Sequence, residues 1–332
     1  MSQPEPVEPT DNEKGIPEVP QQPAPQPELG PSPPSASDTT PTPFMELIKL
    51  DAVHATDEQI KGCVNRQVLL DVKTSGLLCK YTVVLLHADG SLTRGAANRI
   101  YTTVAKAERA KPILLILYSS GGDVSAAYLI AKLCQEHTDK TFEVAVPRRA
   151  KSAATLVCCG ADKIHMGSLS ELGPIDPQFS GLPALALKYS VEHIAQLCSK
   201  YPAASGMFSD YLAKSLSIQA LGFFERVAES AVQYAVRLLR ERVKAPDEKA
   251  CDVIARRLVY AYKDHGFVID SREAADIFGQ DTIACNTDEY RLSNVVFDNL
   301  DFATWLCNKR FSRELSYIGD YTEGCMVWPK GE

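Results

Sequence analysis

The sequence lacks long apolar runs, a secretion signal and basic clusters. No uninterrupted apolar stretch reaches the roughly 18 residues of a membrane-spanning helix, and the N-terminus lacks the charged-then-apolar pattern of a signal peptide. The net charge is −7, with acidic and basic residues interspersed. Nucleic-acid-binding proteins instead show a basic stripe or patch. We therefore expect a cytoplasmic protein that has no membrane span and binds no nucleic acid.

Paired cysteine motifs are also missing. Ten cysteines are scattered without a CxxC pair, and the six histidines do not combine with them at zinc-ligand spacing. This pattern favours reduced thiols over a disulfide framework, as in the cytosol. We predict neither a metal nor a cofactor.

Composition divides the 332-residue chain unevenly. The first 43 residues hold 13 of the 21 prolines and almost no large apolar side chains, so residues 1–43 are predicted to be a disordered tail. Its PxxP-like spacing is compatible with an SH3-type ligand, although a plain flexible tail is the expected interpretation. Residues 44–240 are predicted to form the core, and residues 241–332 a helical extension packed on it.

Strands and helices alternate through the first half of the core. Apolar runs that end in turns predict four strands, and the α/β alternation predicts a parallel sheet. The second half reads as mostly helical, and residues 44–79 as mixed helix and loop. The predicted strands are 81–87, 112–118, 141–147 and 162–166; the predicted later helices are 191–201, 215–243, 248–262, 271–278 and 287–300.

A Ser-Ser-Gly-Gly turn at 119–122 follows the second strand. Gly121 and Gly122 permit positive φ and let the backbone approach another group closely. Their N–H groups, at the start of a helix, can point at a developing negative charge. The alternative is a tight strand-to-helix turn without chemistry.

Ser152 begins a short apolar helix about thirty residues later. A serine at a helix start is most often an N-cap. The helix behind it, ATLVCC, is apolar all round and must be buried, which places Ser152 at a buried mouth of the fold. If the Gly121–Gly122 turn lies on the adjacent strand, its amides and that of Ala153 bracket an oxyanion beside the Ser152 hydroxyl.

A nucleophilic serine needs a base. His165 alternates with apolar residues along a strand, which favours a core or rim role, and Lys151 is expected to point away. Lys188 and Lys200 lie farther along, and a lysine acts as a base only when burial lowers its pKa. The apolar run around Lys188 makes it the preferred candidate, with an exposed structural lysine as the alternative.

A loop bounded by proline and glycine follows the fourth strand. It carries Glu171, Asp176 and Gln178 within SELGPIDPQ. A rigid loop of this kind suits substrate positioning or a subunit contact.

Three motifs in this order, SSGGD, AKSAAT and SELGPIDPQ, resemble the serine dehydrogenase proteinase family. That family is related to signal peptide peptidase A and more distantly to the Clp protease. The resemblance covers residues 81–178 firmly and the helical remainder loosely. It implies the α/β Clp/crotonase-like fold, a repeated ββα spiral with a mostly helical C-terminal part, and assembly into a homo-oligomer.

The resemblance also implies catalytic roles. It makes Ser152 the nucleophile and Gly121, Gly122 and Ala153 the oxyanion hole. Relatives of the signal peptide peptidase type use a Ser–Lys dyad, for which Lys188 is the candidate here, while Clp uses Ser–His–Asp. Asp176 fills the loop position that corresponds to the Clp histidine.

We therefore expect a serine peptidase that cleaves polypeptide substrates. Its base is Lys188, Lys200, Asp176 or a group from a neighbouring subunit. One alternative is an inactive scaffold or binding protein with the same fold. Another is acyl-CoA chemistry, in which paired amides polarise a thioester carbonyl.

Overall fold

The computed structural model describes residues 42–90, 92–175, 178–179, 182–215 and 218–331. Nearly all of the predicted tail, and Asp176 of the loop, lie outside the described residues. Contacts group residues 41–332 into one compact unit, separate from residues 1–40.

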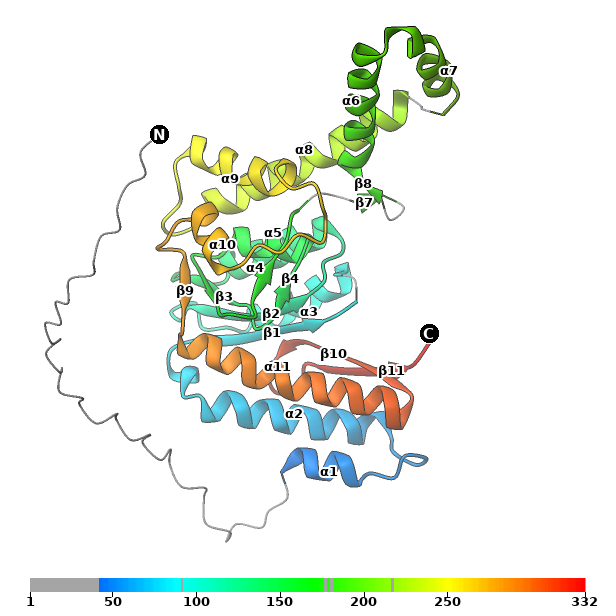
Figure 1. Cartoon of the computed structure of the whole chain (residues 1–332). Coiled ribbons are helices and arrows are strands. Elements are labelled where there is room, and N and C mark those ends of the chain that lie inside the picture. The colour runs from blue at the N-terminus through cyan, green and yellow to red at the C-terminus, as the bar shows by residue number, and fades with distance from the viewer. Residues whose placement is uncertain (1–41, 91, 176–177, 180–181, 216–217, 332) are drawn as a thin grey trace, which may run out of the picture. The chain divides into compact units, whose positions relative to one another are not determined.

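A nine-stranded mixed sheet forms the centre of this unit (Figure 1). The main path of the sheet runs β11-β10-β1-β2-β3-β5-β9. Pairing is parallel from β1 to β9 and antiparallel between β1, β10 and β11. The strands are β1 (Thr82–Ala88), β2 (Ile113–Ser119), β3 (Phe142–Ala145), β4 (Arg149–Ala150), β5 (Lys163–Met166), β6 (Glu171–Leu172), β9 (Ile283–Cys285), β10 (Arg313–Asp320) and β11 (Cys325–Pro329), with a separate hairpin of β7 (Gln178–Phe179) and β8 (Leu182–Pro183).

Helices cover both faces of the sheet (Figure 1). They are α1 (Pro43–Lys49), α2 (Asp57–Thr74), α3 (Arg94–Val104), α4 (Val124–Glu136), α5 (Ala153–Cys159), α6 (Ala184–Lys200), α7 (Ser205–Ser215), α8 (Ile218–Arg240), α9 (Glu248–Tyr260), α10 (Ser271–Phe278) and α11 (Asp288–Leu306), with short turns η1 (Leu77–Cys79), η2 (Pro202–Ala204) and η3 (Cys307–Phe311).

The core has two layers because the central strands are apolar on both faces, as parallel strands covered on both sides must be. Alternate residues of β1 enter different layers: Val84 and Leu86 pack with α3, α4, α5 and α8, whereas Val83 and Leu85 pack with α2 and α11. The two faces of the sheet therefore present separate environments.

The four predicted strands and their parallel order are confirmed, as are helices close to the predicted ranges in the second half. The 44–79 segment contains α2, whose first turn is fixed by a capping box between Thr56 and Gln59. Seven strands of the described residues were not predicted. They are the two-residue strands β4 and β6, the β7–β8 hairpin, and β9, β10 and β11, which come from the last third of the chain and extend the sheet on its two sides. The boundaries at 43 and 240 stay predictions.

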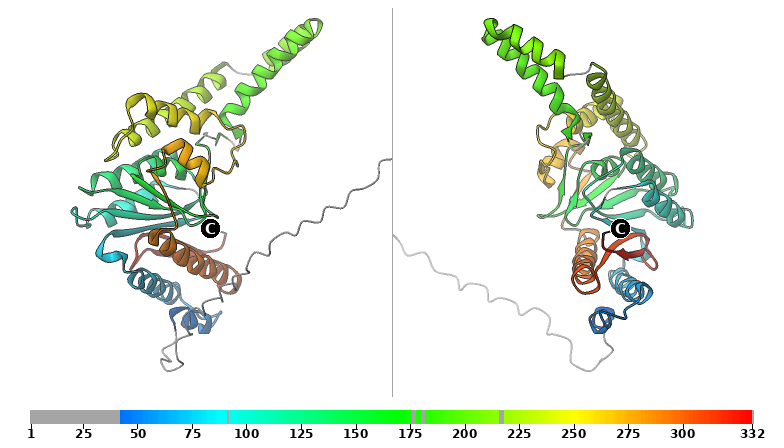
Figure 2. Two further views of the ribbon diagram at one scale, coloured as in Figure 1. Left: turned by 60° about the vertical axis from the view of Figure 1, so that its left-hand side comes forward. Right: turned by 90° about the vertical axis from the view of Figure 1, so that its right-hand side faces the viewer.

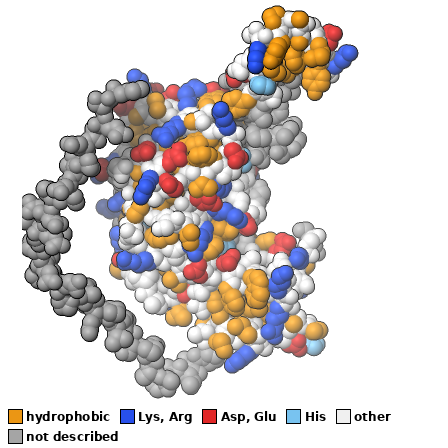
Figure 3. Space-filling view, viewed as in Figure 1, with side chains coloured by type: hydrophobic (Ala, Val, Ile, Leu, Met, Phe, Trp, Pro, Cys, Tyr) orange, Lys and Arg blue, Asp and Glu red, His pale blue; other side chains and the backbone are white. Residues whose placement is uncertain are grey.

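Helices α6 and α7, with the start of α8, form an arm that extends away from the sheet (Figures 1 and 2). Its outer part carries exposed apolar side chains, visible at the top of Figure 3. They include Tyr201, Met207 and Tyr211, which are 52%, 63% and 64% exposed. Among the described residues, no helix is both long and apolar enough to cross a membrane.

Candidate active site

Ser152 has a backbone conformation that few residues other than glycine adopt. It joins β4 to α5 with φ 51° and ψ −122°. A strained backbone of this kind costs on the order of 1–3 kcal/mol and is concentrated at functional sites. Although Ser152 stands at the N-cap position, its side chain makes no capping hydrogen bond within the described chain. The Ser152 hydroxyl is therefore not used to cap α5.

The Gly121–Gly122 turn lies against Ser152, as the sequence predicted. A Cβ on Gly121 would come within 2.8 Å of the Ser152 Cβ and 2.9 Å of the Lys151 carbonyl oxygen. Both glycines have positive φ, 111° and 144°. Leu92 holds the turn from the other side, because its N–H donates to the Gly121 carbonyl at 2.7 Å. Only glycine permits this approach.

The amides of the turn are not equivalent. The Gly121 N–H donates to the buried Ser119 hydroxyl at 3.1 Å. Gly122 lines the pocket beside Ser152. Ala153 is the first residue of α5, where backbone N–H groups have no partner inside the helix. Of the three predicted oxyanion-hole residues, Gly121 thus has its N–H already paired with Ser119 and supplies the close approach to Ser152.

A pocket of about 600 Å³ opens at Ser152. Its walls come from the start of α4 and from one face of α8, where residues three and four apart share a side. The wall mixes polar side chains, among them Asp123 and His265, with the apolar side chains of Val124, Val227 and Ala231. The pocket is lined by Ser120, Gly122, Asp123, Val124, Ser125, Ser152, Val227, Ser230, Ala231, Tyr234 and His265.

His265 is a residue that the sequence did not indicate. It lies in the loop between α9 and α10, 113 positions after Ser152, and lines the same pocket. A histidine is the side chain most often used as a general base near neutral pH. Its local signal was weak, since an isolated histidine in a YKDHGF loop resembles ordinary surface.

The predicted lysine bases are not brought to Ser152 by any contact of the described side chains. Lys188 lies in α6, but its side chain is outside the described part of the structure. Lys200, at the far end of α6, is exposed and its ammonium lies over the Tyr201 ring. Gln178 is in β7, likewise without a described side chain.

Glu171 has a definite partner in Lys151. Its carboxylate lies 3.1 Å from the Lys151 ammonium, and β6 pairs with β4 so that Glu171 is opposite Arg149. The loop therefore contacts the segment that precedes Ser152. The Lys151 side chain, which was expected to point away from Ser152, runs to this carboxylate and is only 14% exposed.

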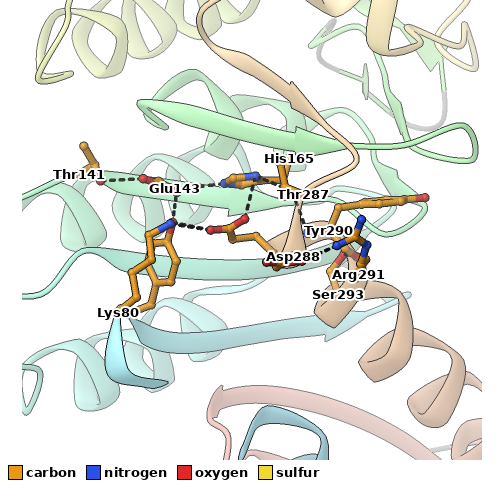
Figure 4. Close-up of polar contacts among 11 residues, drawn as sticks. Lys80, Thr141, Glu143, His165, Thr287, Asp288, Tyr290, Arg291 and Ser293 are labelled. Atoms are coloured by element: carbon orange, nitrogen blue, oxygen red, sulfur yellow. Dashed lines mark hydrogen bonds and ion pairs between the residues drawn. The ribbon is translucent and has the colours of Figure 1, made fainter. Parts of the chain in front are cut away.

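A second polar cluster lies on the other face of the sheet, beside α11 (Figure 4). His165 is buried, as predicted for a core role, and its Nε2 lies 3.0 Å from Glu143. Its Nδ1 lies 2.9 Å from the Thr287 hydroxyl and 3.7 Å from Glu289. The Tyr81 hydroxyl bridges both carboxylates, at 2.7 and 2.8 Å.

Hydrogen bonds keep these buried carboxylates ionised. Burial alone raises the pKa of Glu289, but hydrogen bonds from Lys80, from a backbone N–H and from Tyr81 outweigh it and lower the pKa to about 2. Burial similarly opposes ionisation of Glu143, and hydrogen bonds from His165 and Tyr81 still bring its pKa below the usual value.

The same three side chains are the candidates for holding a metal. Glu143, His165 and Glu289 offer ligand atoms that all lie within 4.8 Å of one another. However, the two imidazole nitrogens face different carboxylates, and Lys80 donates to Glu289 at 2.8 Å. A cation shared by three ligands would need separations nearer 3 Å at bond lengths of about 2 Å. The cluster is better explained as a hydrogen-bonded cross-link between β3, β5 and α11.

Comparison with known proteins identifies the sequence pattern around Ser152. The model of the ClpP-like SDH-type serine proteinase family matches residues 91–196. The predicted resemblance is confirmed. The matched range holds all three motifs, and the described sheet agrees with the predicted Clp/crotonase-like α/β class.

Two curated relatives come from Methanocaldococcus jannaschii. Uncharacterized protein MJ0137 is 41% identical over 96 residues, which are 29% of this chain and 33% of that protein. Uncharacterized protein MJ1495 is 38% identical over 76 residues, 23% of this chain and 26% of that protein. The chain thus matches a third or less of the length of these relatives.

Two solved structures match part of the chain. A mutant of the 1510-N membrane-bound stomatin-specific protease has a TM-score of 0.39 and 14% identity, covering 62% of this chain and 80% of that one. A mutant ClpP1 from Listeria monocytogenes has a TM-score of 0.38 and 16% identity, covering 67% of this chain and 99% of that one.

Proposed function

We propose that the protein is a serine peptidase in which Ser152 is the nucleophile. The observation that carries this proposal is the strained Ser152 backbone, in contact with a Gly-Gly turn at the floor of a pocket. The Ser152 oxygen attacks a peptide carbonyl while its proton passes to a base. The N–H groups of Gly122 and Ala153 then stabilise the oxyanion. Loss of the amine leaves an acyl-enzyme, which water hydrolyses.

Two residues are candidates for the base. His265 is supported by its place in the wall of the Ser152 pocket. Lys188 is supported by the Ser–Lys dyad of related peptidases and by its apolar sequence context. We favour His265, because a base must come within hydrogen-bond reach of the nucleophile or of one intervening water.

The test is hydrolysis of an unfolded casein by the full-length protein and three variants. Ser152→Ala should abolish cleavage, and His265→Gln should reduce it at least a hundredfold. Lys188→Met should leave most activity if His265 is the base, and should remove it if the dyad operates. Retention of full activity by Ser152→Ala would show that another residue is the nucleophile.

The same assay separates the rival functions. An inactive scaffold protein would cleave nothing in any variant. Crotonase-type chemistry would show saturable binding of a CoA thioester, which the proposed peptidase would not. We propose polypeptides as the substrate class, because the pocket is open and partly apolar.

We also propose that the protein assembles as a homo-oligomer in the cytoplasm. Exposed Met207 and Tyr211 on the arm support a subunit contact, since large apolar patches commonly mark interfaces. Ten free cysteines support a reducing compartment. Sedimentation velocity should detect an assembly that dissociates in Tyr211→Lys; a monomeric wild-type protein would refute the assembly.

A further inference from the structure

We propose that Lys151 is a positioning residue that fixes the His265 loop against the Ser152 turn, and that Glu171 and Gly173 serve to hold Lys151. This inference rests on the proposed function. It gives the Ser-Glu-Leu-Gly segment a role that its sequence did not reveal.

The Lys151 ammonium contacts two separate segments. It lies 3.1 Å from the Glu171 carboxylate of β6. It also donates to the Phe267 carbonyl at 3.0 Å and reaches the Gly266 carbonyl at 3.5 Å. Gly266 and Phe267 directly follow His265, so one charged group ties β6 to the loop that lines the pocket.

The Lys151 side chain passes over Gly173 on its way to these acceptor oxygens. A Cβ on Gly173 would come within 2.7 Å of the Lys151 Cδ. The Gly173 N–H donates to the buried Thr155 hydroxyl of α5 at 3.0 Å, which holds the glycine in place. The motifs around Ser152 and Glu171 are therefore physically one unit.

The loop that carries His265 is held by backbone hydrogen bonds at one end and by side-chain contacts at its tip. At the first of these, Ile269 and Leu172 exchange backbone hydrogen bonds of 2.9 and 3.1 Å. At its tip the Gly266 N–H donates to the Asp264 carboxylate at 3.0 Å, and the ring centroids of Tyr262 and Phe267 lie 4.8 Å apart at an interplanar angle of 37°. The Lys151 contacts fall on this tip, where they set the distance of His265 from the nucleophile.

Lys151 does not compete for the role of base. Its ammonium forms an ion pair with the Glu171 carboxylate and donates to the Phe267 carbonyl, so its polar contacts are already made with β6 and the His265 loop. A base needs the free amine lone pair. The Lys151 ammonium instead fixes the position of His265, and it does not accept the proton of Ser152.

The experiment measures fluorophosphonate labelling of the full-length protein as a function of probe concentration. Lys151→Met should lower the maximal labelling rate ten- to a hundredfold, because small displacements of a catalytic group cost about that much. The probe concentration for half-maximal rate should change little. Lys151→Arg should restore part of the rate, since a guanidinium also reaches carboxylate and carbonyl oxygens.

Further variants distinguish the loss of the Lys151 contacts from misfolding of the protein. Gly173→Ala displaces the lysine chain without removing its charge, and Glu171→Gln removes its anchor; both should slow labelling. The double variant Lys151→Met/Glu171→Gln should lose little more than Lys151→Met alone. Lys132→Met, which removes an exposed ion pair with Glu136 on α4, is the matched control and should label normally.

The outcomes distinguish this inference from the proposed function. A purely structural role for Lys151 would reduce the labelled fraction but not the rate constant of the folded protein. Wild-type rates in Lys151→Met and Gly173→Ala would overturn the inference, while loss of labelling in Ser152→Ala would still support the peptidase. Undiminished labelling in Ser152→Ala would instead overturn the nucleophile.

Discussion

Gly121 lies so close to Ser152 that a Cβ on the glycine would come within 2.8 Å of the serine Cβ. The contact joins the turn after β2 to the turn before α5, and both turns have unusual backbone angles. It brings an amide-bearing turn and a hydroxyl together.

Gly121→Ala should therefore disable the site. The added methyl group collides with Ser152 and with the Lys151 carbonyl, at a φ of 111° that alanine tolerates poorly. We expect at least a hundredfold loss of cleavage and a destabilisation of about 2 kcal/mol, measured by casein hydrolysis and urea unfolding. Gly222→Ala on exposed α8 is the control, because nothing lies within 4 Å of its Cβ. Equal behaviour of the two variants would contradict the proposed contact.

Ser119→Ala should weaken the site more mildly. The buried Ser119 hydroxyl accepts from the Gly121 N–H, so its removal leaves an amide unpaired at a cost of about 1–3 kcal/mol. Labelling of Ser152 should slow while the half-saturating probe concentration stays constant. Thr102→Ala, which removes an exposed hydroxyl on α3, should have no effect. A wild-type labelling rate in Ser119→Ala would show that the turn does not need this hydrogen bond.

Stability should fall with acid in two steps. Burial lowers the pKa of His87 from 6.5 to about 4, so the unfolded chain binds a proton first and stability falls as the pH drops through this window. Glu289, at a pKa of about 2 against a usual 4.5, loses its contribution as the pH falls from about 4.5 to 2.

His87→Phe is the matched test of the upper step. His87 stacks on Tyr118 at 4.7 Å, and phenylalanine preserves the ring without a titrating group. Urea unfolding between pH 7 and 4 should show a decline on the order of 3 kcal/mol in the wild type. The variant should lose less over that range. Parallel pH curves for the two proteins would refute the assignment.

The Glu143–His165–Glu289 cluster should support stability but not catalysis. Glu289→Gln removes the charge that faces Lys80, Tyr81 and His165 and should destabilise the fold by about 3 kcal/mol. The rate of Ser152 labelling in the remaining folded protein should be unchanged, since the cluster lies on the other face of the sheet. Manganese or zinc should not raise the melting temperature. Metal-dependent stabilisation that Glu289→Gln removes would instead establish a metal site.

The sequence was sufficient for the four parallel strands β1, β2, β3 and β5 because their apolar runs and turns are local signals. It also located Gly121, Gly122 and Ser152, whose pattern is specific. The β10 strand was missed because it pairs with β1, more than two hundred positions away, and local periodicity does not report such pairing; β11 pairs in turn with β10.

His265 and the orientation of Lys151 could not be deduced for a similar reason. The proposed role of each residue depends on the loop between α9 and α10. This loop is far from Ser152 in the sequence but lies at the same pocket in the fold. Lys151, next to Ser152, was expected to point away from it, but the path of its side chain across Gly173 is a contact that only the folded backbone reveals.

The central claim is that Ser152 is the nucleophile, and mapping the residue modified by a fluorophosphonate tests it most directly. Intact mass and peptide sequencing after labelling should find one adduct per chain, on Ser152. The Ser152→Ala variant, folded by circular dichroism, should take up none. An adduct on a different residue, or equal labelling of Ser152→Ala, would contradict the account.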